Sequence, residues 1–381
     1  RCGSARVALP GPPLPAAGPT FSNEVVRILQ THCQSCHHEG DIAPFSLTTY
    51  AEAAPRAEAI RFMTASRRMP PWKPAAGCGD FADARGLSQE EIDTIARWAD
   101  SGAPEGDRSL LPRPLVFDSG WTLGEPDLVL ASPEPFTAPA SGDMYRCFTM
   151  PANQTTDRYV SAIDVHPGDR SSVHHVIAFL DTAGASAGLD AADPQPGYTC
   201  FGGPGFSLTA DATLGGWAPG YRAFTLPEDV ALRLPANARV VLQVHYHSND
   251  GRPEPDQTEL AIYFAKKPPK QLLRIIPLVN QSFEIPPGEA NYRVTAGIPV
   301  IPFPLHLWVI APHMHLLGRS MKVEMTMAAG QTECLIHIDD WDFNWQAMYR
   351  YRTPIAVPAW SSVNLVAHYD NSASNPRNPN D

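Results

Sequence analysis

The chain has 381 residues, of which 43% are hydrophobic, 18% are charged and 40 are prolines, a composition typical of a folded and loop-rich protein. A formal charge of −11 argues against a nucleic-acid groove, because phosphate binding relies on concentrated Lys and Arg. No uninterrupted apolar run reaches the roughly 18 to 20 residues of a membrane-spanning helix, so we expect no transmembrane segment in this chain.

The N-terminal region predicts a leader followed by a small helical domain. Residues 1–20 form a Pro-rich leader, because they hold too many Pro and Gly residues for a helix or a strand ladder. Ser22 is placed to cap a short helix that runs into Cys33. Ser88 begins a capping box that starts a second helix. We therefore predict an all-α domain over residues 21–107.

The remainder of the chain predicts β structure. Short alternating or β-branched runs are separated by turn signals and occur at Tyr159–Val165, Val173–Leu180, Val240–His247, Leu260–Ala265, Pro304–Ile310, Met321–Met327 and Val363–Tyr369. Many short strands without intervening helices favour antiparallel sandwiches. The stretch Lys-Lys-Pro-Pro-Lys near residue 270 marks a boundary. We predict one β-sandwich over residues 108–270 and a second over residues 271–381.

The segment Cys33-Gln34-Ser35-Cys36-His37 has the pattern of covalent haem attachment. Two thiols three residues apart at the end of a helix can each form a thioether to a haem vinyl group, and His37 is then placed to bind the iron. A structural zinc knuckle is the alternative, but no second Cys pair stands at zinc-finger spacing.

Met69 is the candidate for the sixth ligand of the iron. It lies on a Pro-rich loop between the two predicted helices, and a rigid loop that presents a thioether suits a ligand that raises the haem potential. A buried core methionine is the alternative. His32 and His38 are nearer in sequence, and we expect them to be solvated neighbours.

Residues 21–107 resemble class I cytochrome c domains. The likeness consists of a helix that leads into the Cys-x-x-Cys-His motif, a downstream Met loop, and a last helix whose Trp98 packs on the first. The resemblance implies a low-spin electron carrier with a covalent haem c held by Cys33, Cys36, His37 and Met69. Such haem is attached outside the bacterial cytoplasm, so the resemblance also implies export.

Histidine pairs are the second unusual feature, and they lie at His174-His175, His245-x-His247 and His313-x-His315. Residues i and i+2 of a strand share a face, so His313 and His315 can bind one metal ion. Adjacent His174 and His175 point to opposite faces unless a bulge intervenes or the rings use different nitrogens. A lone pair is more often solvated or hydrogen-bonded, but three separated pairs favour metal sites, and imidazole clusters suit copper or zinc.

The order and flanks of these pairs are similar to the copper type II, ascorbate-dependent monooxygenases, the family of peptidylglycine alpha-hydroxylating monooxygenase and dopamine beta-monooxygenase. The similarity covers roughly residues 115 to 381. It is carried by His174-His175, by Val-Leu-Gln-Val-His-Tyr at 241–246, by His-Met-His-Leu-Leu-Gly at 313–318, and by Gly-Trp-Ala-Pro-Gly at 216–220.

The resemblance implies two jelly-roll β-sandwich domains with one copper each, facing across an open cleft. The ligands that it implies for a first, electron-accepting copper are His174, His175 and His245. For a second copper, where O2 is bound, it implies His313 and His315. His247 is a rival to His245, because the two share a strand face, and we rank it second.

One part of the family pattern has no counterpart here. The family's second copper takes a Met thioether from a late segment, which the sequence lacks before Asp381. Met314 would point away from its flanking histidines on a regular strand. We expect the given chain to be a trimmed form of a longer one, with the missing Met beyond Asp381. An intact mass of the native protein that ends at Asp381 would contradict this expectation.

The cysteines predict an oxidising compartment. The resemblance implies a disulfide between Cys147 and Cys200, which correspond to a family disulfide of the first copper domain; free buried thiols are the alternative. Pairing among Cys2, Cys78 and Cys334 cannot be read from the sequence. We expect an exported protein, periplasmic or extracellular, and leave association with a membrane open.

These features predict a copper-dependent monooxygenase that hydroxylates a C–H bond with O2 and receives electrons from its fused haem. Its partners would be O2 and an unknown organic substrate, with an external electron donor and a larger assembly left open. The alternative is a non-catalytic haem and copper electron-transfer subunit of a larger exported assembly. A zinc hydrolase is disfavoured, because no Glu base stands beside the histidines. The aromatic segment 341–345 can line a substrate cleft, although we favour a place in a sandwich core.

Overall fold

The computed structural model describes residues 18–117, 120–209, 212–248, 254–280 and 282–379. These residues form two compact units. The first unit contains the described residues up to Glu39 together with Pro44–Pro70 and Gly86–Leu115, and the second contains Gly40–Ala43, Pro71–Arg85 and the described residues from Val116 onward. Most of the predicted leader, including Cys2, lies outside the described residues.

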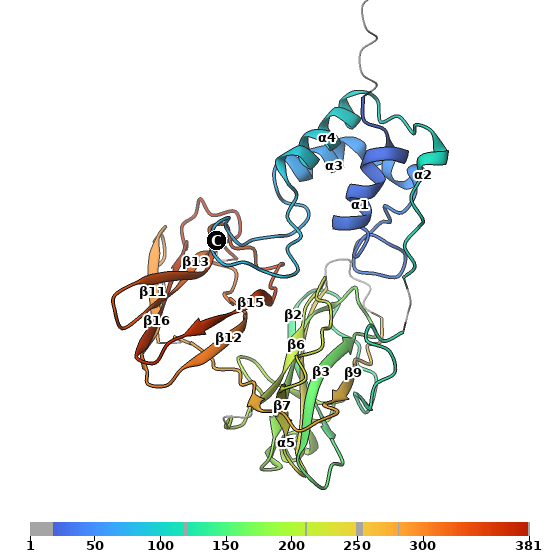
Figure 1. Ribbon diagram of the computed structural model, residues 1–381. Coiled ribbons are helices and arrows are strands. Elements are labelled where there is room, and N and C mark those ends of the chain that lie inside the picture. Colours follow the sequence, from blue (N-terminus) through green and yellow to red (C-terminus); the bar gives the residue numbers. More distant parts are fainter. Residues whose placement is uncertain (1–17, 118–119, 210–211, 249–253, 281, 380–381) are drawn as a thin grey trace, which may run out of the picture. The chain divides into compact units, whose positions relative to one another are not determined.

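The first unit is helical (Figure 1). Its elements are η1 (Phe21–Val25), α1 (Val26–His32), α2 (Tyr50–Ala53), η2 (Ala54–Arg56), α3 (Ala57–Ala65), α4 (Gln89–Asp100) and η3 (Arg108–Leu110). Leu29 of α1 and Ile95 of α4 are fully buried in one apolar core. The ring centroid of Trp98 in α4 lies 6.4 Å from that of Phe21, so the last long helix packs on the first, as the sequence predicts.

The two predicted caps have different outcomes. The Ser88 side chain accepts from the Glu91 backbone N–H, and the Glu91 side chain accepts from the Ser88 N–H, so the capping box is confirmed. The prediction for Ser22 is wrong, because the helix begins at Phe21 and the Ser22 hydroxyl is buried with no hydrogen-bond partner among the described residues. The carboxylate of Glu24 instead accepts from the Thr20 N–H at 2.8 Å, which satisfies a donor at this end.

The first β-sandwich consists of two five-stranded sheets. Their strands are β1 (Leu128–Ala131), β2 (Gly142–Pro151), β3 (Arg158–His166), β4 (Val173–Asp181), β5 (Tyr198–Thr199), β6 (Thr213–Trp217), β7 (Val230–Leu234), β8 (Arg239–Ser248), β9 (Glu259–Phe264) and β10 (Gln271–Leu272). The strand orders are β1-β9-β3-β7-β10 and β5-β2-β8-β4-β6. Alternate residues of both sheets, among them Val160, Leu242 and Val244, form the buried core between them.

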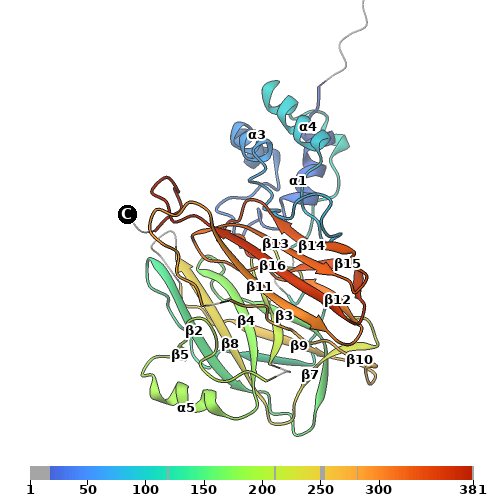
Figure 2. The same cartoon turned by 90° about the vertical axis from the view of Figure 1, so that its left-hand side faces the viewer.

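The second β-sandwich contains a four-stranded sheet, β11-β16-β13-β14, and a two-stranded sheet, β12-β15 (Figure 2). Its strands are β11 (Tyr292–Ile301), β12 (Leu305–Ile310), β13 (Gly318–Thr326), β14 (Thr332–Ile338), β15 (Tyr349–Val357) and β16 (Ser361–Tyr369). Met321, Val323 and Ile336 are among its buried core residues. Each strand predicted from an alternating run is present, and β-sandwich architecture is confirmed, whereas the jelly-roll topology stays a prediction.

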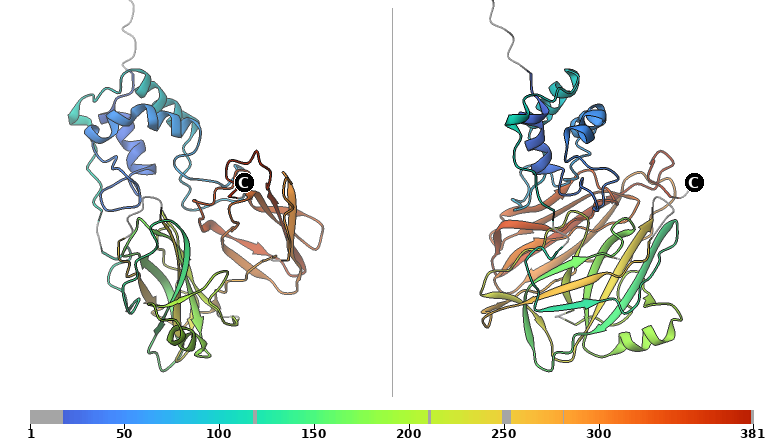
Figure 3. Two further views of the ribbon diagram at one scale, coloured as in Figure 1. Left: turned by 180° about the vertical axis from the view of Figure 1, so that it is seen from behind. Right: turned by 90° about the vertical axis from the view of Figure 1, so that its right-hand side faces the viewer.

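The outer face of the β5-β2-β8-β4-β6 sheet carries a second apolar cluster and the short helix α5 (Ala185–Ala192), drawn in light green in Figure 3. The disulfide that the resemblance implies, Cys147–Cys200, is present in this cluster with an S–S distance of 2.03 Å. It ties β2 to the loop that follows β5. This loop carries Phe201, which is 71% exposed.

Residues 71–85 belong to the second unit, although they fall within the predicted helical range. Cys78 forms a disulfide with Cys334 of β14, which pairs two of the cysteines left open by the sequence. The backbone forms bridges between Pro74 and Ile338 and between Phe81 and Tyr351, so the segment lies along β14 and β15. The boundaries between the predicted domains otherwise stay predictions.

Two disulfides are typical of a protein from an oxidising compartment. In the part of the chain that the structure describes, no helix has both the length and the apolar character needed to cross a membrane.

Candidate metal centre

A β-bulge brings His174, His175 and His245 to one place. β4 and β8 are antiparallel neighbours, and His175 lies directly opposite His245. Both residues alternate with core residues and therefore face away from the sandwich core. The strand register shifts between Val173 and His175, which frees His174 from the opposite face that a regular strand would impose. A bulge was one of the two conditions under which the sequence analysis allowed the adjacent rings of His174 and His175 to meet, and this bulge is present.

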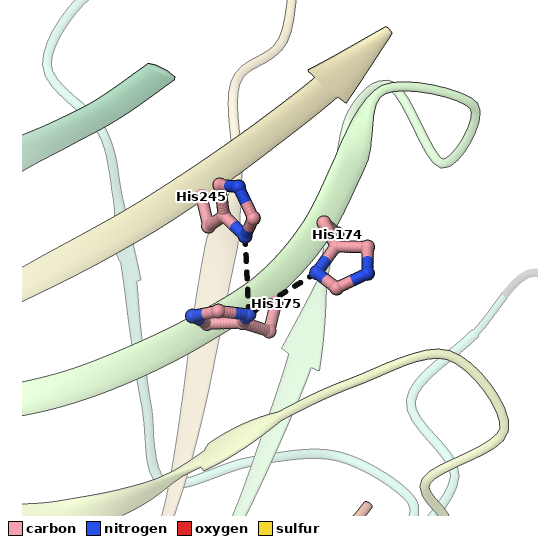
Figure 4. A group of neighbouring side chains, drawn as sticks. All are labelled: His174, His175 and His245. Carbon is pink, nitrogen blue, oxygen red and sulfur yellow. Dashed lines mark hydrogen bonds between the residues drawn. The ribbon is translucent and has the colours of Figure 1, made fainter. Parts of the chain in front are cut away.

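The three rings converge through the same nitrogen, as Figure 4 shows. The Nδ1 atom of His175 lies 3.3 Å from Nδ1 of His174 and 3.3 Å from Nδ1 of His245. Two nitrogens that bind one ion at about 2.0 Å in tetrahedral geometry are about 3.3 Å apart, so the spacing fits a shared metal ion. A single proton on His175 cannot satisfy both neighbours, whereas a metal ion would take all three lone pairs. The donor set of three imidazoles suits copper.

Burial keeps these imidazoles neutral, which is the form that binds metal. Desolvation, followed by the neighbouring His174 and His247, lowers the pKa of His245 to about 2. Desolvation and then His247 lower the pKa of His174 to about 4. Desolvation, His245 and His174 also place the pKa of His175 well below its usual value.

The other ring nitrogen of His245 faces Asp143 of β2. His245 Nε2 lies 2.7 Å from Asp143 Oδ1, and His247 Nδ1 lies 2.9 Å from the same oxygen. His247 therefore points its ring to the carboxylate, and the structure brings His245 rather than His247 into the three-histidine cluster. Tyr145, which is opposite His245 on β2, stacks on its ring at 4.1 Å between centroids with an angle of 2° between the planes.

His313 and His315 form a separate pair on the loop between β12 and β13. They follow the apolar strand β12, as the sequence indicates, and lie on a loop rather than on a regular strand. Their rings meet, with 3.1 Å between the two Nε2 atoms. Both residues keep contact with solvent. Neighbouring groups nevertheless desolvate the His313 ring in part, and this desolvation, followed by His315, lowers the pKa of His313 to about 4. Met314 is buried in the second sandwich core, so it points away from the pair, as predicted.

Aromatic rings connect the two histidine groups within the second unit. Phe343 stacks on His174 at 5.4 Å between centroids and lies 6.1 Å from His315. The rings of His175 and His313 are 6.2 Å apart. The resemblance implied an open cleft between the two groups, and these ring contacts instead occupy the space between them. Phe343 is 6% exposed, so this part of the aromatic segment 341–345 is buried, as favoured from the sequence.

The residues of the predicted haem site lie in the first unit. Cys33 caps the end of α1, and Cys33 and Cys36 are both half-buried and outside the two disulfides of the described residues. Burial, with a smaller contribution from Cys36, raises the pKa of Cys33 to about 12. His37 Nδ1 lies 3.1 Å from the Phe45 carbonyl oxygen. Donation from this nitrogen leaves Nε2 available, which is how metal-binding histidines are commonly oriented, so the donor set fits a haem.

The structure also shows the surroundings of Met69, His32 and His38 in the first unit. Met69 lies in the loop between α3 and α4, as expected, and is half-buried. His38 Nδ1 lies 2.8 Å from the Gln34 carbonyl oxygen. The prediction that His32 is solvated is wrong, because its side chain is 12% exposed and Nε2 lies 3.0 Å from Glu91 Oε1 on α4. The helix pairing buries it, which the local sequence could not reveal.

The sequence interpretation did not identify Asp143, Tyr145 or Gln346. The amide of Gln346 lies beside His313 and partly offsets the lowering of its pKa. Asp143 and Tyr145 become neighbours of the histidines only through the pairing of β2 with β8. Their alternation with Cys147 was a signal that all three share one face of a strand.

Known proteins that resemble this chain in sequence do so over about half of its length. No family model matches the chain. DBH-like monooxygenase protein 1 from Homo sapiens is 25% identical over 202 residues, which covers 48% of this chain and 32% of that protein. The Mus musculus protein of the same name is 24% identical over 231 residues, which covers 55% of this chain and 37% of that protein. The chain is a distant relative of the DBH-like monooxygenases over about half its length.

This chain spans about a third of the length of those DBH-like relatives. A solved structure described as an alpha-L-fucosidase from Bacteroides ovatus aligns with a TM-score of 0.18 and 9% identity, over 76% of this chain and 41% of that chain, and supports no argument. The relatives named here are monooxygenases. The cytochrome c domain therefore stays a prediction.

Proposed function

We propose that this chain is a copper-dependent monooxygenase that hydroxylates a C–H bond of an organic substrate with O2. The observation that carries the proposal is the convergence of three Nδ1 atoms, from His174, His175 and His245. The distant similarity to DBH-like monooxygenase protein 1 supports the class of reaction.

In this proposal the three-histidine cluster holds one copper through Nδ1, and His313 and His315 hold a second through Nε2. Bound copper supplies one-electron redox chemistry and the reduction of O2. The overall reaction consumes substrate, O2, two electrons and two protons, and it yields the hydroxylated substrate and water. His245 is fully buried and shields its site from solvent, whereas the exposed His313 and His315 leave room for O2 and substrate.

We also propose that the first unit carries a covalent haem c. The thiols of Cys33 and Cys36 would hold the haem covalently through its two vinyl groups, and His37 Nε2 and the Met69 thioether would bind the iron. Bound haem supplies electrons one at a time. The contact of His37 Nδ1 with the Phe45 carbonyl supports this assignment, because it orients the ring with Nε2 away from the backbone. The two disulfides support an exported protein, periplasmic or extracellular.

Metal analysis of the purified protein tests both assignments. We expect two coppers and one iron per chain, with oxygen uptake that depends on an added amine or peptide from a substrate screen. Iron without copper would contradict the proposed monooxygenase. It would favour the alternative, a non-catalytic electron-transfer protein. Zinc in place of copper would contradict the proposed copper sites and the monooxygenase.

The proposed role of the haem has its own experiment. Stopped-flow mixing of the reduced protein with O2 and substrate should show haem oxidation at the rate of product formation. Haem that stays reduced while product accumulates would exclude it as the electron donor.

A further inference from the structure

The two ring nitrogens of His245 have different partners. Nδ1 lies 3.3 Å from Nδ1 of His175 within the three-histidine cluster, whereas Nε2 lies 2.7 Å from Oδ1 of Asp143. The ring is fully buried, so a proton on Nε2 needs an acceptor supplied by the protein. Asp143 is that acceptor. By accepting from Nε2–H, its carboxylate selects the tautomer whose Nδ1 lone pair points into the cluster.

Strand pairing holds Asp143 at this position. Asp143 lies on β2 directly opposite His247 of β8, and two residues further along β2 Tyr145 lies opposite His245. The same carboxylate oxygen is 2.9 Å from His247 Nδ1, so two histidines of one strand share it. Its side chain is 34% exposed, and the carboxylate therefore keeps access to water on one side.

The second histidine pair has a neutral neighbour in the corresponding role. The amide of Gln346 lies beside His313, whereas the Asp143 carboxylate is in direct contact with His245 of the first cluster. The charge of Asp143 also reaches His315 of the second pair, but no hydrogen bond joins them among the described residues. A negative charge at this distance stabilises Cu(II) relative to Cu(I). It therefore lowers the reduction potential of the first site and favours passage of an electron from that site to the second.

We infer that Asp143 is a positioning residue that sets both the copper affinity and the reduction potential of the site formed by His174, His175 and His245. This inference rests on the proposed function. In this inference Asp143 selects the ring nitrogen of His245 that faces the cluster, and its charge acts more strongly on the first copper site than on the second.

Two substitutions separate the hydrogen bond from the charge. Asp143→Asn keeps an oxygen that accepts from His245 but removes the charge, and Asp143→Ala removes both. We expect Asp143→Ala to weaken one of the two copper equivalents by about 10- to 100-fold and to change the other much less, since Asp143 contacts only the first site. Asp143→Asn should retain most of the affinity and shift the potential of that site upward. The measurements are titrations with Cu(I) and Cu(II) against a competing chelator, redox titration, and EPR of the Cu(II) form, all without substrate.

Asp339→Asn is the matched control, because Asp339 forms an exposed pair with His337 at 2.8 Å and has no contact with the five histidines. It should leave both copper equivalents unchanged. Copper binding by the wild-type protein tests the proposed function separately, since a wild type that binds no copper contradicts that function. A wild type that binds two coppers, with Asp143→Asn unchanged in potential and EPR spectrum, would overturn the inference alone. If Asp143→Ala fails to fold, Asp143→Asn decides the outcome.

Discussion

The two histidine groups present different ring nitrogens to a metal. His174, His175 and His245 converge through Nδ1, whereas His313 and His315 converge through Nε2. Nδ1 is the nitrogen nearer to the backbone, and it suits ligands on two adjacent strands that already lie close together. Nε2 is the far end of the ring and suits a pair on a loop. The backbone around each group therefore decides which nitrogen is offered.

His245 and His247 can be separated by substitution. Because only His245 lies in the three-histidine cluster, His245→Ala should reduce the copper content from about two to about one per chain. His247→Ala is the matched control and should keep both coppers. Copper analysis with EPR of the remaining Cu(II) measures the difference. Loss of copper in His247→Ala with full copper in His245→Ala would reverse the assignment.

Met69 and Met63 offer a second comparison, since both are half-buried in the first unit and the Met69 N–H donates to the Met63 carbonyl oxygen at 3.1 Å. Met69→Leu should convert the haem to a high-spin form and lower its reduction potential, because a thioether ligand raises that potential. Met63→Leu should leave the absorption spectrum and the potential unchanged. The opposite pattern would make Met63 the ligand.

At the scale of single elements, the ends of β4 are held by carboxylates that accept backbone N–H groups. Asp181 at its C-terminal end is 2% exposed and accepts from Ala183 N, Gly184 N, Ser186 N and Ser186 Oγ at 2.6 to 3.0 Å. At its other end Asp256 Oδ1 accepts from the Gly168 and Asp169 N–H groups. These turns fix the strand that carries His174 and His175.

Asp181→Asn should lower the free energy of unfolding by about 1–3 kcal/mol at pH 7, because it leaves buried donors with a weaker acceptor. Burial raises the pKa of Asp181, but the hydrogen bonds, led by Ser186, outweigh it and place the pKa below its usual value. The carboxylate therefore stabilises the fold above a pH of about 4, and this stabilisation is lost as the pH falls through the folded-state pKa. In urea unfolding, the difference in the free energy of unfolding between wild type and Asp181→Asn should become smaller from pH 7 to pH 3.

Asp190 of α5 is the control for this experiment. Its pKa is raised, with burial as the main cause, so its charge does not stabilise the fold. Asp190→Asn should leave the free energy of unfolding unchanged or raise it. If Asp190→Asn lowered the free energy of unfolding as much as Asp181→Asn, any carboxylate in this region would have the same effect.

At the scale of the whole molecule, the segment 71–85 completes the second unit. β14 and β15 are the outer strands of their sheets, and the segment lies along both through its bridges to Ile338 and Tyr351. Phe81 contributes to the core and is 4% exposed. Gly79 has a φ of +78° and approaches Leu335 so closely that a Cβ atom would lie 2.8 Å from its carbonyl oxygen. The chain thus covers sheet edges that would otherwise promote association.

Phe81→Ala should destabilise the second unit by about 3–5 kcal/mol, since it opens a cavity in that core. Phe62→Ala is the matched control, because Phe62 is 62% exposed on α3, and it should change stability by less than about 0.5 kcal/mol. Calorimetry and urea unfolding measure both. Equal effects of the two variants would mean that residues 71–85 contribute little to the core.

Two of the strands that the predicted runs did not include, β11 and β15, share a physical reason. β11 contains Pro299 and β15 contains Pro354, and both strands lie at sheet edges, where a residue without an N–H is tolerated. The central strand β8 alternates regularly between core residues and outward-facing residues, and it was predicted correctly.

The sequence by itself determined what depends on neighbours in the chain: the helical and β regions, the capping box at Ser88, and the motifs that contain Cys33, His174 and His313. Only the tertiary structure decided what depends on strand register and long-range packing. The bulge before His175, the carboxylate of Asp143 and the disulfide between Cys78 and Cys334 belong to this second group. A shift of one residue in register turns every side chain of a strand to the other face, and the local sequence does not specify which strand lies alongside.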